Sequence, residues 1–104
     1  MVKFVTDQKT AKGWKNKNGT ASRHCKCGTW IDHWRRFSGR SWPDECSVDG
    51  CTKTAKLGAH VYSSSVSGEY IVPMCNSCNK QGNEFDLNVG VTAVSANRSE
   101  TCEK

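Results

Sequence analysis

Residues 58–62 read Gly-Ala-His-Val-Tyr, and residues 70–80 read Tyr-Ile-Val-Pro-Met-Cys-Asn-Ser-Cys-Asn-Lys. The β-branched and aromatic residues in these stretches are typical of strands. The pattern predicts a hairpin of two strands, Ala59–Val66 and Glu69–Met74, that turns at Ser67-Gly68. This hairpin is the central element from which the rest of the chain can be interpreted.

Two close cysteine pairs flank the predicted hairpin. Cys75 and Cys78 are three positions apart at the start of a short helix expected to end near Gln81, so one helical turn would place both sulfurs on one side. Cys46 and Cys51 bracket a glycine, which permits the positive φ of a tight turn. The arrangement predicts one Zn²⁺ ion held by four thiolates. Such a site would be structural, because no position is left for a reactive water.

The composition favours a cross-link. The chain has 104 residues, which predicts one domain, and it contains only four Ile or Leu residues for a core. Seven cysteines could supply metal thiolates in a reducing compartment or disulfides in a secreted protein. The odd number excludes complete internal disulfide pairing, and residues 1–7 lack the apolar run of a signal peptide. We therefore favour metal binding in the cytoplasm and expect no membrane segment.

Positive charge is concentrated in the first part of the chain. Ten of the 15 basic residues, but only two of the ten acidic residues, lie in residues 1–40. This imbalance favours DNA or RNA as a partner, although lysines in a polar segment can also be simply solvated. Residues 1–22 are polar and rich in Lys, Asn, Thr and Gly, so we expect a flexible basic leader that could contain a short strand at Lys3–Thr6. Residues 23–104 would then form a single zinc-binding domain.

A helical pattern of aromatic residues begins after Thr29. Trp30, Trp34 and Phe37 recur at i, i+4 and i+7, with Thr29 as a suitable N-cap and Gly39 as a suitable stop. We expect this aromatic face to pack into the core. Stacking on nucleic-acid bases is the alternative.

Three arginines lie at or just beyond the end of this helix, Arg35, Arg36 and Arg40. The helix dipole favours cations there, and guanidinium groups match the geometry of phosphate oxygens. These residues are the candidate nucleic-acid contacts. A solvated helix end would have the same sequence pattern.

A second metal site could be built from the remaining cysteines. Cys25 and Cys27 form a Cys-x-Cys pair that could chelate one ion, and Cys102 would tie the C-terminal tail to it. His33 would complete this second site, and His24 is adjacent in sequence. In the alternative interpretation Cys102 is a free thiol and His33 packs on the aromatic face.

The order of cysteine pair, hairpin and helix over residues 46–82 resembles a treble-clef zinc finger. The motif Gly-Ala-His-Val, followed by Ile-Val-Pro-Met-Cys-x-x-Cys-Asn, is similar to sequences of the HNH endonuclease family. That resemblance implies a ββα-metal core in which His60 is the general base and Asn79 ligates Mg²⁺ or Mn²⁺, with Glu69 able to supply a further oxygen. Ala59 stands where the family has an acidic metal ligand, so the implied centre is degenerate. His60 could instead replace one of the zinc ligands.

Residues 25–60 are also similar, through Cys-Gly-x-Trp, His-Trp and Ser-Gly, to a group of small bacterial zinc proteins of unassigned role.

Weak alternation of apolar and polar residues over Phe85–Val94 predicts one or two further strands. The predicted fold class is therefore α+β: a small zinc-stabilised treble-clef (HNH-like) core with an aromatic helix and extra strands.

The leading functional hypothesis is a zinc-binding module that contacts nucleic acid and retains a degenerate HNH-like centre. One alternative is an active metal-dependent phosphodiester endonuclease of the HNH type, which would also need Mg²⁺ or Mn²⁺. Another is a structural or protein-interaction zinc domain with a protein partner.

Overall fold

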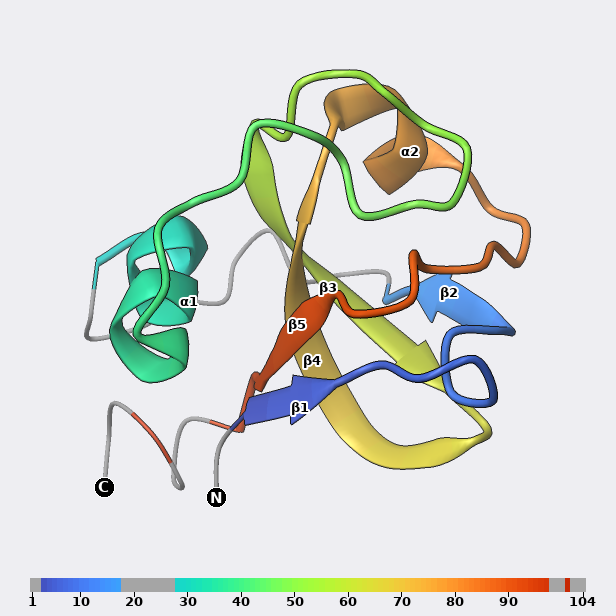
Figure 1. Ribbon diagram of the computed structural model, residues 1–104, viewed down its shortest axis with the longest axis horizontal. Coiled ribbons are helices and arrows are strands. Elements are labelled where there is room, and N and C mark those ends of the chain that lie inside the picture. Colours follow the sequence, from blue (N-terminus) through green and yellow to red (C-terminus); the bar gives the residue numbers. More distant parts are fainter. Residues whose placement is uncertain (1–2, 18–27, 98–100, 102–104) are drawn as a thin grey trace.

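Five strands form one antiparallel sheet with the order β1-β5-β4-β3-β2 (Figure 1). The computed structural model describes residues 3–17, 28–97 and 101. Its elements are β1 (Lys3–Val5), β2 (Trp14–Asn16), α1 (Trp30–Ser38), β3 (Leu57–Ser63), β4 (Val66–Met74), α2 (Asn76–Lys80) and β5 (Thr92–Ser95). The fold is a small α+β fold, as predicted.

Helix α1 begins and ends where the sequence predicts. Thr29 is the N-cap, and its side chain and that of Asp32 form a reciprocal capping box. Gly39 ends the helix with φ of 68°, a left-handed conformation that favours glycine, and its N–H donates to the carbonyl of Arg35. Trp34 is buried, and the half-buried Trp30 and Phe37 pack beside it. The aromatic side of α1 therefore belongs to the core.

The central hairpin forms, but its turn lies earlier than predicted. Strand β3 ends at Ser63 and β4 begins at Val66, so Ser64 and Ser65 make the turn in place of Ser67-Gly68. The register of the ladder shifts between Tyr62 and Ser63. Gly68 takes a positive φ of 87° beside this irregularity. The Ser-Gly signal thus marks a bulge in β4, because a bulge also requires the conformational freedom of glycine.

Residues 3–17 do not form the expected flexible leader. They contribute β1, which pairs with β5, and β2, which pairs with β3. Trp14 is fully buried, its indole N–H donates to the carbonyl of Thr10 at 2.7 Å, and its ring packs against Phe4 and Tyr70. Burying so large an apolar side chain orders the segment despite its polar neighbours. The lysines at 15 and 17 alternate with Trp14 and remain exposed.

The residues after α2 supply one strand and two isolated bridges. Strand β5 covers the end of the region where one or two strands were expected. Before it, Phe85 bridges to Trp14 and Leu87 bridges to Val48. Phe85 and Leu87 are buried in the same apolar cluster as Trp14. Irregular backbone therefore closes this side of the core.

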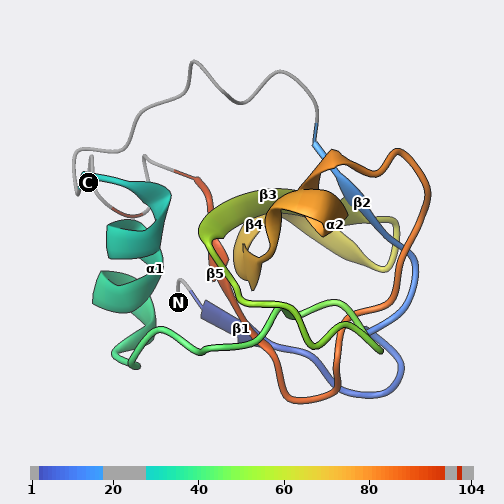
Figure 2. The ribbon, with the colours of Figure 1, turned by 90° about the horizontal axis from the view of Figure 1, so that it is seen from above.

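The two faces of the sheet pack against different parts of the chain. We call the side that carries Gly58, His60, Ile71 and Val94 the helix face, because α1 packs on it. We call the opposite side, with Val61, Val72, Met74 and Ala93, the cysteine face, because two of the cysteines share its apolar cluster. Figure 2 shows α1 lying to one side of the strands.

Candidate metal centre

The first cysteine pair lies in the loop between α1 and β3, whose residues 44–56 we call the cysteine loop. The backbone N–H of Cys46 donates to the carbonyl of Lys53, and the N–H of Cys51 donates to the carbonyl of Val48. Gly50 has φ of 82°, as the sequence predicted for this turn. These bonds fold the segment into a tight turn that directs both thiols to one side.

The second pair lies at the start of α2, directly after β4. Cys75 is the N-cap, and its sulfur accepts from the backbone N–H of Cys78 at 3.4 Å. The hydroxyl of Ser77 lies 3.5 Å from the same sulfur. Lys53 of the cysteine loop donates to Ser77 at 3.2 Å, which links the two segments. In Figure 1 the cysteine loop runs beside α2.

The four sulfurs converge on one point. The Sγ atoms of Cys46, Cys51, Cys75 and Cys78 all lie within 4.8 Å of one another. The sulfurs of Cys51 and Cys75 are 3.8 Å apart. A tetrahedral zinc ion with Zn–S bonds of about 2.3 Å separates its sulfurs by roughly 3.8 Å. The cluster could therefore hold a metal ion such as zinc, and its donors are the soft ligands that zinc prefers.

The electrostatics of the cluster favour a cation. Burial opposes ionisation of Cys75, but hydrogen bonds from Ser77 and Cys78, with a contact to the thiol of Cys51, lower its pKa to about 6. Burial, together with the neighbouring thiols, raises the pKa of Cys78. Burial is also the main reason that the pKa of Cys46 is raised. The protein alone thus favours the thiolate of Cys75 and disfavours those of Cys46 and Cys78, which a bound cation would stabilise.

The predicted second metal site lies largely outside the described residues. His24, Cys25, Cys27 and Cys102 are not among them. His33 is fully buried, and its Nε2 lies 2.8 Å from the carbonyl oxygen of Ser95. Its ring contacts Trp30 and Phe37, as the packing interpretation expects. A ligand role for His33 stays a prediction.

The HNH-like residues lie on three elements, β3, β4 and α2. His60 and Glu69 are diagonal neighbours on the helix face, since His60 pairs with Ile71 and Glu69 pairs with Tyr62. Asn79 lies on α2. His60 is only 4% exposed, and the indole of Trp30 covers it at a ring distance of 4.4 Å. A buried histidine of this kind favours a packing role.

The three predicted phosphate contacts lie together and are all exposed. We call Arg35, Arg36 and Arg40 the arginine patch. With Asp32, Gly39 and Ser41 they line an open depression of about 450 Å³ at the end of α1. The sequence therefore identified a set of neighbouring surface cations.

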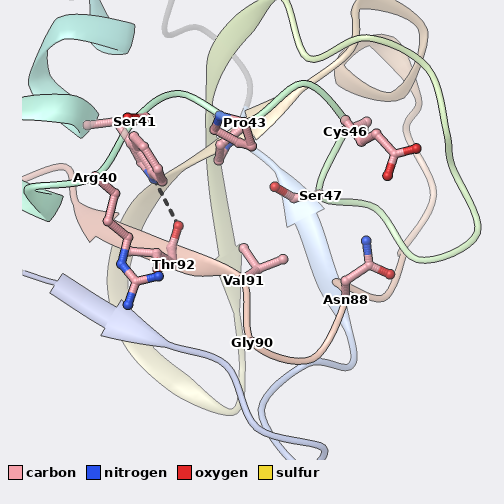
Figure 3. Close-up of a pocket in the computed structure, with 12 residues that line it drawn as sticks. Arg40, Ser41, Pro43, Cys46, Ser47, Asn88, Gly90, Val91 and Thr92 are labelled. Carbon is pink, nitrogen blue, oxygen red and sulfur yellow. Dashed lines mark hydrogen bonds between the residues drawn. The ribbon is translucent and has the colours of Figure 1, made fainter.

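A second cavity, of about 400 Å³, lies between residues 40–47 and residues 88–92 and was not predicted (Figure 3). Trp34 closes one end, where its indole N–H donates to the carbonyl of Thr92 at 2.9 Å. Ser47 and Asn88 lie at the other end. Their backbones are joined, because the N–H of Asn88 donates to the carbonyl of Ser47. These residues are about 40 positions apart, and no local pattern connects them.

Comparison with protein-family models, curated proteins and solved structures finds no match to this chain. Among the described residues, no helix is both long enough and apolar enough to cross a membrane.

Proposed function

We propose that Cys46, Cys51, Cys75 and Cys78 bind one structural zinc ion in a treble-clef arrangement. The observation that carries this proposal is the convergence of four sulfurs within 4.8 Å. The order of cysteine loop, β3–β4 hairpin and α2 supports the treble-clef interpretation. Four thiolates leave no open position, so this ion holds the fold together and activates no water.

We further propose that the module contacts nucleic acid through the arginine patch. The patch is exposed, and planar guanidinium groups bind phosphate oxygens in pairs of hydrogen bonds. Within the described part of the chain, no acidic side chain forms an ion pair with Arg40 or Arg35. Contacts of this kind are independent of sequence and weaken as salt is added.

The HNH-like residues form a degenerate centre in this proposal. His60 is buried beneath Trp30, and Ala59 offers no carboxylate to a second metal. We expect the protein to show no plasmid nicking with Mg²⁺ or Mn²⁺. Nicking that is abolished by His60→Gln would replace this proposal with the endonuclease alternative.

Two measurements test the proposed function. Elemental analysis of protein purified under reducing conditions should find zinc, and Cys78→Ser should remove one equivalent.

Binding to a labelled oligonucleotide should weaken with salt. The double variant Arg35→Gln/Arg36→Gln should reduce the slope of log K against log salt by roughly 0.7 to 0.9 for each phosphate that is no longer neutralised. Lys56→Gln/Lys80→Gln removes the same charge elsewhere on the surface and should leave the slope nearly unchanged. Equal slopes in the two double variants would refute the arginine patch as the interface, and dimerisation without nucleic-acid binding would favour a protein-interaction domain.

A further inference from the structure

The cavity between residues 40–47 and 88–92 is large enough for a small ligand. Its volume of about 400 Å³ lies in the range of small-molecule sites. Pro43 and Val91, both half-buried, supply apolar surface along it. The indole N–H of Trp34 is already engaged by Thr92, so that end presents no free donor.

The polar side chains of the cavity lie at its two ends. Figure 3 shows Arg40 at one end and Ser47 with Asn88 at the other. In the described part of the chain no hydrogen bond engages the guanidinium of Arg40 or the amide of Asn88; the bonds of these residues are made by their backbones. Glu45 also lines the cavity, next in sequence to Cys46 at the Asn88 end. An anionic group would therefore bind at the Arg40 end.

The cavity is continuous with the arginine patch. Arg40 and Ser41 line both the cavity and the open depression that contains Arg35 and Arg36. A phosphate chain bound on the patch would pass the mouth of the cavity at Arg40. The group that such a chain carries next to each phosphate is a planar base with a hydrogen-bonding edge.

We propose that this cavity receives one unpaired nucleotide of a single-stranded nucleic acid. Arg40 contacts its phosphate, Pro43 and Val91 contact the faces of the base, and the amide of Asn88 and the hydroxyl of Ser47 bond to the base edge. A base within a duplex cannot enter without leaving its stack and its partner. The protein therefore prefers single strands. This inference rests on the proposed nucleic-acid contact and specifies the form of the partner.

The experiment compares three labelled probes by fluorescence anisotropy at one fixed salt concentration. They are a single-stranded DNA decamer, the blunt duplex of the same sequence, and a decamer with abasic residues throughout, which keeps the phosphates but lacks the bases. The variant is Asn88→Asp, which adds a charge at the base end of the cavity. Asn83→Asp is the matched control, because Asn83 is exposed and lies outside the cavity. This substitution changes the net charge by the same amount as Asn88→Asp.

We expect the wild type to bind the single strand about ten-fold more tightly than the abasic strand, since one base contact is removed. The duplex should also bind more weakly than the single strand. Asn88→Asp should abolish most of the preference for the single strand over the abasic strand and the duplex. Asn83→Asp should weaken the binding of all three probes by the same factor. Asn88→Ala should reduce the preference for the single strand by a smaller factor. Because this variant adds no charge, it serves as a second test if Asn88→Asp fails to fold.

Two outcomes overturn the inference and can be told apart. If all three probes bind equally, or if Asn88→Asp matches Asn83→Asp, the cavity takes no base and the proposed contact through the arginine patch still stands. If no probe binds the wild type, the proposed function fails and the inference fails with it.

Discussion

The helix face and the cysteine face of one sheet are covered by segments of opposite character. On the helix face, α1 is a regular helix with its own caps, and its aromatic residues pack on Ile71 and Val94. On the cysteine face the cover is mostly irregular, made from the cysteine loop and residues 84–91. Its backbone groups bond to other segments, as when the N–H of Ser47 donates to the carbonyl of Pro73.

This difference indicates where a cross-link would contribute most to stability. A helix satisfies most of its backbone hydrogen bonds internally, so packing alone can hold it on a sheet. An irregular cover depends on partners from distant parts of the chain, and ordering it costs conformational entropy. The four converging cysteines belong to the irregular side. We therefore expect changes on the cysteine face to act on the whole fold and changes on the helix face to act through packing.

Removing the metal should have the largest effect. A structural zinc site contributes roughly 10–16 kcal/mol in small domains, whereas the entire free energy of unfolding is commonly about 5–15 kcal/mol. We expect a strong chelator, or Cys78→Ser, to abolish the cooperative thermal transition and the near-UV signal of the tryptophans. Ser77→Ala, which removes only a hydroxyl beside Cys75, should keep the ion and the transition. A chelated chain that melts at the same temperature would remove the basis of the comparison.

Truncation of Trp34 should have the next largest effect. Its side chain is 3% exposed and its indole donates to Thr92, so Trp34→Ala should destabilise the protein by about 3–5 kcal/mol in urea unfolding. Trp34→Phe should cost less, because the ring volume is partly retained. The zinc content of the folded fraction should remain unchanged, since none of the four cysteines that the structure describes belongs to this apolar cluster. Loss of zinc in proportion to loss of stability would mean that the two faces are not separable.

A methyl group at Gly58 tests how closely α1 approaches the sheet. A Cβ there would lie 3.0 Å from Ile71 and 3.0 Å from the backbone of Trp30. Because the backbone cannot yield easily, Gly58→Ala should cost about 1–3 kcal/mol. Gly82→Ala is the control, as a Cβ at Gly82 would meet no atom of the described residues within 4 Å. Equal stability of the two variants would show that the helix moves away from the sheet at little cost.

Loss of the N-cap should have the smallest effect. Thr29→Ala removes the side-chain oxygen that accepts from the N–H of Asp32 at 3.1 Å, which should cost about 1 kcal/mol. Thr52→Ala, at an exposed position in the cysteine loop, should be nearly neutral. Thermal unfolding resolves the difference between them. A Thr52 variant as unstable as the Thr29 variant would contradict the assignment of this energy to the cap.

Much of the fold could be predicted where the signals are local. The cap at Thr29, the stop at Gly39, the hairpin and the short helix at Cys75 all depend on residues within a few positions of one another. The prediction of a turn at Ser67-Gly68 was wrong because a glycine in a bulge and a glycine in a turn have the same sequence signal.

Other features could not be predicted, because they depend on contacts between distant residues. Trp14 lies in a polar stretch, and residues 3–17 are ordered by its contacts with Phe4, Tyr70 and Phe85 together with the pairing of β1 and β2 to distant strands. The cavity is a similar case, since Ser47 and Asn88 meet only through the folded backbone.

The sequence by itself determined the two cysteine pairs and the helix that carries Arg35 and Arg36. In both, spacing along the chain sets the distance in space, through one tight turn or one helical turn. Only the tertiary structure decided that the polar N-terminal segment supplies a second strand, β2, around the buried Trp14 and that a cavity opens beside the arginine patch. The physical reason is that burial of a large side chain and the closure of a pocket depend on which segments meet, and no local pattern contains that information.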